Sequence, residues 1–328
     1  MKESTSFSVE APAYAPHIQA PAGAAAMYPD EALFKLPGGY LDESGLTHTE
    51  VKLSPLTGED EYVVGGTDRE LCRAEVVTRL LARCVKSLGT RTQVSRALLA
   101  DLTVGQRDFL MLKLRELTVG HKVACVLRCP AEGCREPMDL AFDTSALDFS
   151  APSLGNRFVT ATLTDGDEDA AEADASQTIE FRLPNGGDQQ ALAGLFSTDP
   201  VAAIDALLAR CLRRVGDCTE IDEAFVAALS PATRLLIDAR MEQFSPQVEC
   251  EIEAQCPECH TPFETSLDLV SHFLEELRAG FRNLEREVHF LAWHYHWSEQ
   301  DILSMNRSRR RRYVALVQQE VDRLNQVW

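Results

Sequence analysis

Two pairs of cysteines have the spacing of a metal-binding site. Cys129 and Cys134 enclose the turn Pro-Ala-Glu-Gly, and Cys256 and Cys259 enclose the shorter turn Pro-Glu. Two thiolates from one tight turn can reach a single ion, and a second turn completes the tetrahedron that zinc prefers. Because four protein thiolates would leave no coordination position open, we predict a structural Zn2+ site whose binding free energy adds to folding.

Two other interpretations of these cysteines stay open. They could be reduced, buried thiols that bind no metal. Alternatively, Cys256 and Cys259 could exchange a disulfide, although such a redox pair normally opens a helix and here strands are expected on both sides. Gly133 is expected to let the wider first turn bend tightly. Cys125 and Cys250 lie near the turns and are expected in the core, because the repeat described next does not relate them.

The chain repeats part of its own sequence at an offset of 127 residues. The segment Leu80–Cys84 recurs as Leu207–Cys211, with the same sequence Leu-Leu-Ala-Arg-Cys. The offset also relates single residues along each half: Gly89 to Gly216, Leu102 to Leu229, Arg107 to Arg234, and Cys129 to Cys256. A constant offset indicates an internal duplication, so the two halves should share a fold and bring their cysteine turns side by side.

The order of patterns predicts an α+β fold, in which a duplicated unit of hairpin, helices and cysteine-bearing strands precedes a helical extension. We expect a disordered tail rich in Ala and Pro at 1–30, a first repeat at 31–150 and a second repeat at 151–270. The remaining residues, 271–328, are expected to form a helical segment that binds partners. The second repeat should carry a long acidic loop between its first two strands.

Periodicity and capping residues predict the individual elements. Hairpins are expected over 34–53 and over 158–183, and strands on either side of each cysteine turn. Helices are expected from Thr67-Asp68 to Gly89, and over 106–117, 200–215, 231–244, 284–297 and 309–324. The helix over 106–117 should turn Arg107 and Arg115 away from its apolar side. Gly280 should mark a kink or a close contact.

Composition limits the classes of function. The chain has 328 residues, of which 45% are hydrophobic, which is enough for real cores in more than one domain. Its formal charge of −19 repels nucleic acid phosphates and favours a basic protein partner. No run of 18 apolar residues and no secretory signal is visible, so we expect a protein that is cytoplasmic at synthesis.

The C-terminal segment combines aromatic and basic residues. Along one helix side we expect an aromatic stripe, followed by a run of arginines, as a partner-binding surface made of Phe290, Trp293, Trp297, Arg309, Arg310 and Arg312. The arginines could instead meet acids of the same chain. Two rival functions use this segment: a zinc-ribbon nucleic-acid-binding protein that uses the arginine helix, and an enzyme that uses His289, His294 and His296. The spacing of these histidines favours neither a pocket nor an open metal position.

Several segments together are similar to one protein family. They are 36–59, 107–120, the two cysteine turns, and 290–313 with its sequence Trp-His-Tyr-His-Trp. The chain resembles the cysteine-knuckle proteins encoded among tail and baseplate genes of contractile-tailed phages and related bacterial contractile injection systems. This resemblance implies a baseplate or hub component, or a factor for its assembly, without enzymatic activity and with other baseplate, hub or tail proteins as partners. It also implies incorporation into a particle that resembles a phage tail.

Overall fold

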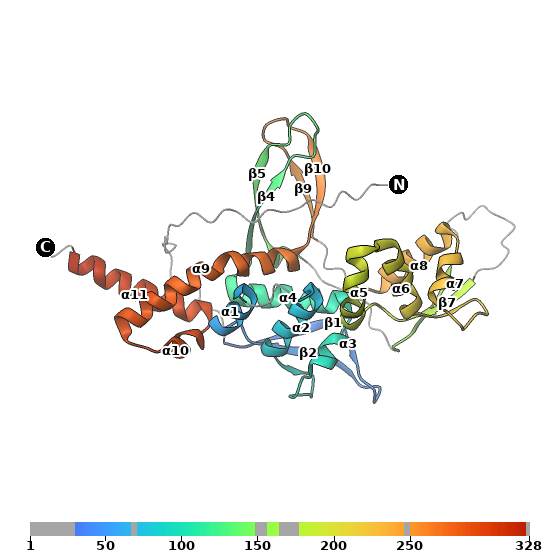
Figure 1. The fold of residues 1–328 in the computed structure, drawn as a ribbon, viewed down its shortest axis with the longest axis horizontal. Helices are drawn as coiled ribbons and strands as arrows, with labels where there is room; N and C mark the ends of the chain where they lie inside the picture. Colours follow the sequence, from blue (N-terminus) through green and yellow to red (C-terminus); the bar gives the residue numbers. More distant parts are fainter. Residues whose placement is uncertain (1–29, 67–70, 148–155, 164–176, 246–249, 326–328) are drawn as a thin grey trace.

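The computed structural model describes residues 30–66, 71–147, 156–163, 177–245 and 250–325, and confirms the α+β class. The predicted tail, apart from residue 30, and the acidic loop of the second repeat lie outside these described residues. No helix within the described ranges is long and apolar enough to cross a membrane. Figure 1 shows two hairpins standing side by side above a row of helices, with α11 at one end of the row and α7 and α8 at the other.

The two halves of the chain have the same order of elements. The first half contains, in sequence order, β1 (Ala32–Leu41), β2 (Thr47–Leu53), α1 (Gly58–Gly66), α2 (Arg73–Cys84), β3 (Val85–Leu88), α3 (Arg96–Asp101), α4 (Val104–Val119), β4 (Lys122–Arg128) and β5 (Pro137–Asp143). The second half contains β6 (Val159–Leu163), β7 (Gln177–Phe181), α5 (Gly186–Thr198), α6 (Pro200–Cys211), β8 (Leu212–Val215), α7 (Glu223–Ala228), α8 (Pro231–Phe244), β9 (Cys250–Gln255) and β10 (Pro262–Leu267). Three helices follow: α9 (Leu269–Tyr295), α10 (Glu299–Leu303) and α11 (Arg307–Asn325).

Each half begins with an antiparallel three-stranded sheet, ordered β1-β2-β3 in the first half and β6-β7-β8 in the second. Both third strands end at a glycine of positive φ, +54° at Gly89 and +57° at Gly216. The amide of Gly89 donates to the Glu50 carbonyl at 2.6 Å, and that of Gly216 donates to the Thr178 carbonyl at 2.8 Å. Because an L side chain strains this backbone conformation, glycine is the residue that suits both positions.

Two predicted helices are shorter than expected, because the strands β3 and β8 take up their last residues. The helices expected to reach Gly89 and Val215 end at Cys84 and Cys211 instead, and four residues of strand follow each. The Cys84 carbonyl accepts a hydrogen bond from the Ser54 amide at 2.9 Å, which draws the chain out of the helix and into the sheet. The helical spacing of the apolar residues continues through these strands, and for this reason periodicity did not separate them.

The helices α9 and α4 also differ from prediction. α9 is one continuous helix that passes through Gly280, where an added Cβ would lie 2.8 Å from Nη2 of Arg307. Gly280 therefore marks a close contact and no break. On α4, Arg107 and Arg115 are fully buried, because α4 is covered on nearly every side. In the last helix, α11, Val314 and Val317 are buried, whereas Val321 is exposed.

Separate apolar cores lie under the two sheets and under the hairpins. The first sheet, α2, α3 and α4 share a core with the N-terminal part of α9, which contributes Val270, Phe273, Leu274 and Leu277. A second core lies between β6–β8 and α6–α8, and a third lies between the two hairpins, β4–β5 and β9–β10. α9 thus begins beneath the hairpins and belongs, over its first turns, to the first half.

In the described part of the chain a pair of helices occurs three times, whereas the sequence repeat predicted only the longer helices of the first two pairs. In each pair a short helix is capped by Ser95, Asp222 or Ser298, and a longer helix follows whose cap lies eight positions later, at Thr103, Ser230 or Asn306. Four residues after the second cap comes an arginine in every copy: Arg107 in α4, Arg234 in α8 and Arg310 in α11. The pair α10–α11 is therefore similar to α3–α4 and α7–α8.

Candidate metal centre and helix junctions

The four predicted ligands lie together at the tips of the two hairpins. Cys129 and Cys134 come from the turn between β4 and β5, and Cys256 and Cys259 from the turn between β9 and β10. Their four sulfur atoms all lie within 4.8 Å of one another. This cluster is the one group of His, Cys, Asp and Glu found among the described residues that could hold a metal ion.

Two short sulfur contacts connect one hairpin to the other. Sγ of Cys129 lies 3.5 Å from Sγ of Cys259, and Sγ of Cys134 lies 3.7 Å from Sγ of Cys256. A tetrahedron with Zn–S distances of about 2.3 Å places its sulfurs about 3.8 Å apart, so the cluster fits that ion. Both contacts are far longer than a disulfide bond of about 2.05 Å, and each of the four cysteines is a free thiol.

The backbone of each turn has the same shape around its second cysteine. The residue that follows it has a left-handed φ, +53° at Arg135 and +59° at His260. The amide of Cys129 donates to the Glu136 carbonyl at 3.0 Å, and that of Cys256 donates to the Thr261 carbonyl at 3.1 Å. Gly133, expected to supply the tight bend, is not among the glycines with positive φ, so the bend lies two residues later than predicted.

The cluster is half sunk into the core between the hairpins. Cys129 and Cys256 are buried, Cys134 is half-buried and Cys259 is exposed. Cys125 is buried in the same core and is not part of the cluster, in agreement with the prediction. The side chain of Cys250 lies outside the described residues.

The thiols of the cluster differ in pKa because their hydrogen bonds and burial differ. Hydrogen bonds with the side chain and the backbone of Thr261 lower the pKa of Cys259 to about 6. A backbone hydrogen bond at Glu136 lowers the pKa of Cys134, but burial and the neighbouring sulfurs outweigh it and raise that pKa to about 12. The protein alone therefore favours one thiolate over four, and a bound dication would supply the charge that stabilises the others.

The predicted partner surface is divided by the structure. Trp293 is 72% exposed, and Arg309 and Arg312 are exposed as well. Phe290 and Trp297 are half-buried and pack around a small core at the end of α9. Trp297 stacks on Tyr295, with ring centroids 4.5 Å apart, and meets Tyr313 edge-on at 4.9 Å. His289, His294 and His296 are exposed, and none belongs to a metal-like cluster.

Arg310 lies inside the molecule, where it holds α11 to α1. Its Nη2 donates to Oε1 of Glu61 at 2.6 Å, its Nε donates to Glu287 at 3.2 Å, and its Nη1 donates to the Met305 carbonyl at 2.7 Å. Arg307 binds the other oxygen of Glu61 at 2.7 Å. Arg310 therefore pairs with acids of its own chain, one of the two possibilities that the sequence allowed. It does not contribute to the exposed surface.

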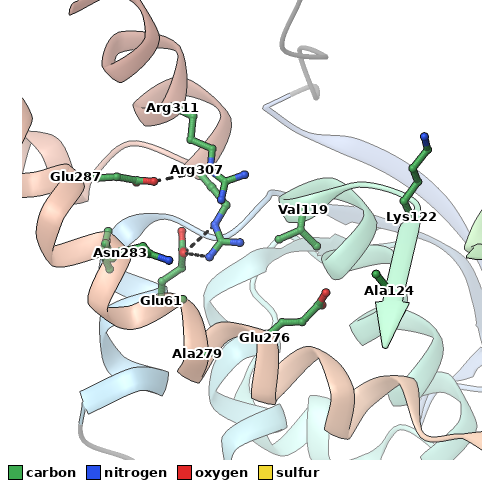
Figure 2. Close-up of a pocket in the computed structure, with 12 residues that line it drawn as sticks. Glu61, Val119, Lys122, Ala124, Glu276, Ala279, Asn283, Glu287, Arg307 and Arg311 are labelled. Carbon is green, nitrogen blue, oxygen red and sulfur yellow. Dashed lines mark hydrogen bonds and ion pairs between the residues drawn. The ribbon is translucent and has the colours of Figure 1, made fainter. Parts of the chain in front are cut away.

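Glu61 was not found by sequence reasoning, because its arginine partners are about 250 residues away and leave no local signal. Burial by itself would raise the pKa of Glu61, but Arg307 and Arg310 lower it below its ordinary value. Figure 2 shows Arg307 and Arg311 reaching from α11 toward Glu61 and Glu287 across a pocket of about 230 Å3. The pocket is thus the site of an ionic contact between α1, α9 and α11.

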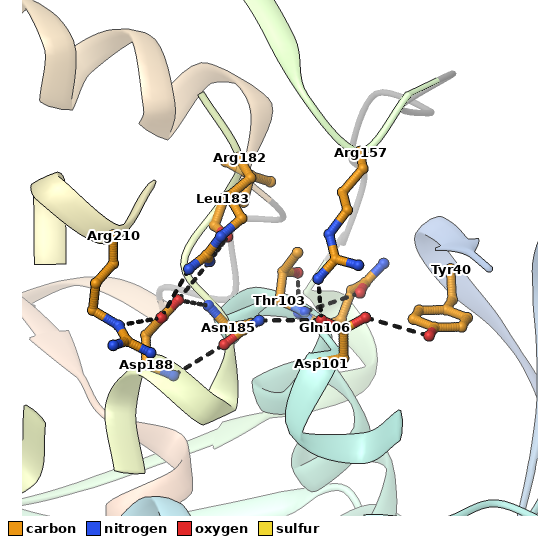
Figure 3. Close-up of polar contacts among 10 residues, drawn as sticks. All are labelled: Tyr40, Asp101, Thr103, Gln106, Arg157, Arg182, Leu183, Asn185, Asp188 and Arg210. Carbon is orange, nitrogen blue, oxygen red and sulfur yellow. Dashed lines mark hydrogen bonds and ion pairs between the residues drawn. The ribbon is translucent and has the colours of Figure 1, made fainter. Parts of the chain in front are cut away.

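A similar junction connects the two halves. The Asn185 side chain caps α5 and also donates to Asp101 at 3.3 Å, while Arg157 donates to the same carboxylate at 2.7 Å (Figure 3). Asp188, the third residue of α5, is bound by Arg182 at 2.6 Å and by Arg210 at 2.8 Å. The start of α5 is therefore fixed to α3 and α4 of the first half on one side and to α6 on the other.

One family of proteins matches most of the chain. The family is described as T4 bacteriophage base plate protein, and the match covers residues 39–275. No curated protein sequence and no solved structure matches the chain significantly. The matched range contains both cysteine pairs and every helix from α1 to α8, and it confirms the resemblance seen in the sequence. The chain belongs to the T4 bacteriophage base plate protein family.

Proposed function

We propose that this protein is a non-enzymatic structural or assembly component of the baseplate of a contractile tail or injection machine, in which one zinc ion staples two hairpins of a duplicated scaffold. Its partners are other baseplate, hub or tail proteins, and it is incorporated into, or assists, a particle of that kind. The family supports the baseplate role. The observation that carries the staple is the cluster of four sulfurs drawn equally from the two halves.

The staple follows from the separation of the ligands along the chain. Cys129 and Cys259 are 130 residues apart, yet their sulfurs are neighbours. An ion bound there would close a long loop, which limits the freedom of the unfolded chain and adds its binding free energy to folding. The duplicated repeats 31–150 and 151–270 would then act as one rigid scaffold.

The metal content of protein purified without chelator tests the staple. We expect one zinc per chain in the wild type and in Cys125→Ala, a matched control that lies in the same core. Cys129→Ser and Cys256→Ser should each lose the ion, because either change breaks the shared tetrahedron. Zinc retained in both serine variants, or a wild type without zinc, contradicts the staple.

The exposed aromatic and basic residues of the C-terminal segment are the proposed partner contact. Trp293, Arg309 and Arg312 combine a large aromatic side chain with guanidinium groups, which are common among residues that dominate binding energy. Trp293→Ala should weaken assembly into the particle and leave the fold unchanged, because its side chain contributes little to the core. Normal assembly of the Trp293→Ala variant would exclude this contact.

A further inference from the structure

The first of the three helix pairs holds the start of another helix. The Gly186 amide of α5 donates to the Leu102 carbonyl at 3.2 Å, and the Val104 amide donates back to the Pro184 carbonyl at 3.0 Å. The guanidinium of Arg107 lies where a Cβ on residue 186 would be, so only glycine permits this approach. The pair α3–α4 therefore binds the first turn of α5 through backbone contacts and one close-packed arginine.

The last helix pair holds the start of α1 in the same way. The Gly58 amide donates to the Met305 carbonyl at 3.0 Å, and an added Cβ at residue 58 would lie 2.9 Å from Nη1 of Arg310. The caps form an antiparallel bridge in both junctions, Thr57 with Asn306 and Thr103 with Asn185. One geometry is thus used twice, with α1 and α5 as the bound helices.

The middle pair, α7–α8, has the same parts and holds no helix start among the described residues. Leu229, Ser230 and Arg234 stand at the positions of Leu102, Thr103 and Arg107. Arg234 donates to Asp205 of α6 at 2.7 Å, just as Arg107 donates to Thr78 of α2 at 2.9 Å. Within the described part of the chain, no group donates a hydrogen bond to the Leu229 carbonyl.

Exposed apolar side chains mark the same place on α6. In the first junction α5 lies against α2, where Gln190 donates to Thr78 at 2.7 Å and Ala74 and Val77 are only 8% and 4% exposed. The equivalent residues of α6 are Val201 and Ile204, which are 66% and 49% exposed. Leu235, which follows Arg234, is 70% exposed. Two large apolar side chains one turn apart on α6, and a third beside the arginine that contacts α6, indicate a binding surface.

We propose that this surface, the open junction formed by Val201, Ile204, Leu229, Arg234 and Leu235, binds the start of a helix from a different protein. The bound segment should read Thr, Asn or Ser, then Gly, then any residue, then Asp, and should present apolar residues to α6. Glycine is required because the arginine occupies the space of a Cβ, and aspartate caps the amide of the first residue, as Asp60 and Asp188 do here.

The partner is a different protein because both helix starts of this type in the chain are already bound within it. α1 is held by α10–α11 and α5 is held by α3–α4. Binding at the open junction involves none of the four cysteines, so this proposal does not depend on the zinc staple.

A helix-stabilised peptide of α5 serves as the probe. A fluorescent peptide of residues 180–198, with Gly194→Lys and Thr198→Asp joined as a lactam, presents Asn185-Gly186 already folded and is titrated into the full-length protein. We expect saturable binding that weakens at least tenfold in the Ile204→Glu protein. Leu316→Glu is the matched control, because Leu316 is 46% exposed on α11, and it should bind as the wild type does.

A variant of the peptide tests whether glycine is required at position 186. A second peptide carrying Gly186→Val should bind at least tenfold more weakly, since its side chain would meet Arg234. Absence of saturable binding, equal binding of the two peptides, or equal binding by Ile204→Glu overturns the proposal. Self-association of the wild-type protein that Ile204→Glu abolishes would assign the junction to a second copy and overturn the choice of a different protein.

Discussion

Replacing Arg310 by methionine should loosen α11 from α1. The side chain of Arg310 is fully buried and binds Glu61, Glu287 and a backbone carbonyl, whereas methionine has a similar length and no charge. Glu61 would keep one of its two cations, Arg307. The change therefore leaves a buried carboxylate partly neutralised.

The expected cost follows from the burial of this pair. Removing one partner of a buried ion pair typically costs about 3 to 5 kcal/mol, and we expect about 3 kcal/mol because Arg307 remains in place. A loss of about 3 kcal/mol corresponds to an opening equilibrium roughly 150 times more favourable. Arg311→Met is the control: Arg311 is half exposed and lies 3.7 Å from Glu287, so its loss should cost less than about 0.5 kcal/mol.

Native-state amide hydrogen exchange over α11 measures this local opening directly. We expect exchange in α11 to be about 150 times faster in Arg310→Met than in the wild type, while β8 and α8 stay unchanged. Glu61→Gln should cost a similar amount, and the double variant should cost clearly less than the sum of the two, because the variants share one interaction.

Two results would refute this reasoning. If Arg310→Met changes the exchange of α11 no more than Arg311→Met does, the buried pair does not hold α11 in place. If the costs of Arg310→Met and Glu61→Gln simply add, the two residues stabilise the molecule independently, and the junction is held by packing instead.

Three other predictions use the same structure. Gly89→Ala should lower the melting temperature more than Gly216→Ala, since both strain the backbone by about 1 to 2 kcal/mol and only an alanine at 89 would also meet the ring of His48; an equal loss would contradict this. Because the pKa of Glu61 is lowered in the folded state, its contribution to stability is present above its unfolded pKa of about 4.3 and is lost as the pH falls through the lower folded value. The protection of α11, corrected for intrinsic exchange, should therefore fall with acidity below about pH 4 in the wild type and stay flatter in Glu61→Gln. Removal of metal by a chelator should speed exchange in the two cysteine hairpins and leave α2 unchanged, whereas equal acceleration in α2 would mean that the ion supports the whole fold.

The duplication and the cysteine pairs were visible in the sequence because their signals are local and repeated. A Cys-Pro turn is recognisable over a few residues. The offset of 127 relates the two turns as equivalent parts of a duplication, and it therefore predicted that they lie side by side without any knowledge of packing. The helix Pro231–Phe244 was predicted with its correct ends because Ser230 caps it and Pro231 opens it. Where a cap residue and a proline mark the start of a helix, the sequence was sufficient to predict its bounds.

The missed features depend on contacts between distant segments. The strand Val85–Leu88 continues the apolar spacing of the helix before it, and only pairing with β2 decides its conformation. Glu61 looks like an ordinary solvent-facing acid until α11 covers it. The third helix pair shares only cap types, spacing and one arginine with the others, which is too little for a repeat to be seen without the structure.

The helices α10 and α11 hold the start of α1, whereas the pair α7–α8 holds no helix start among the described residues. The two ends of the molecule therefore differ in what they can bind. Contacts in which one end of a unit receives the opposite end of the next are heterologous, and when copies continue to add they produce rings or growing filaments. Here the first half offers no helix start for such a contact, because α10–α11 of the same chain already hold the start of α1. In its described part the protein therefore has an open junction at α7–α8 and no free helix start of this type, so copies of it cannot be joined to one another through this geometry.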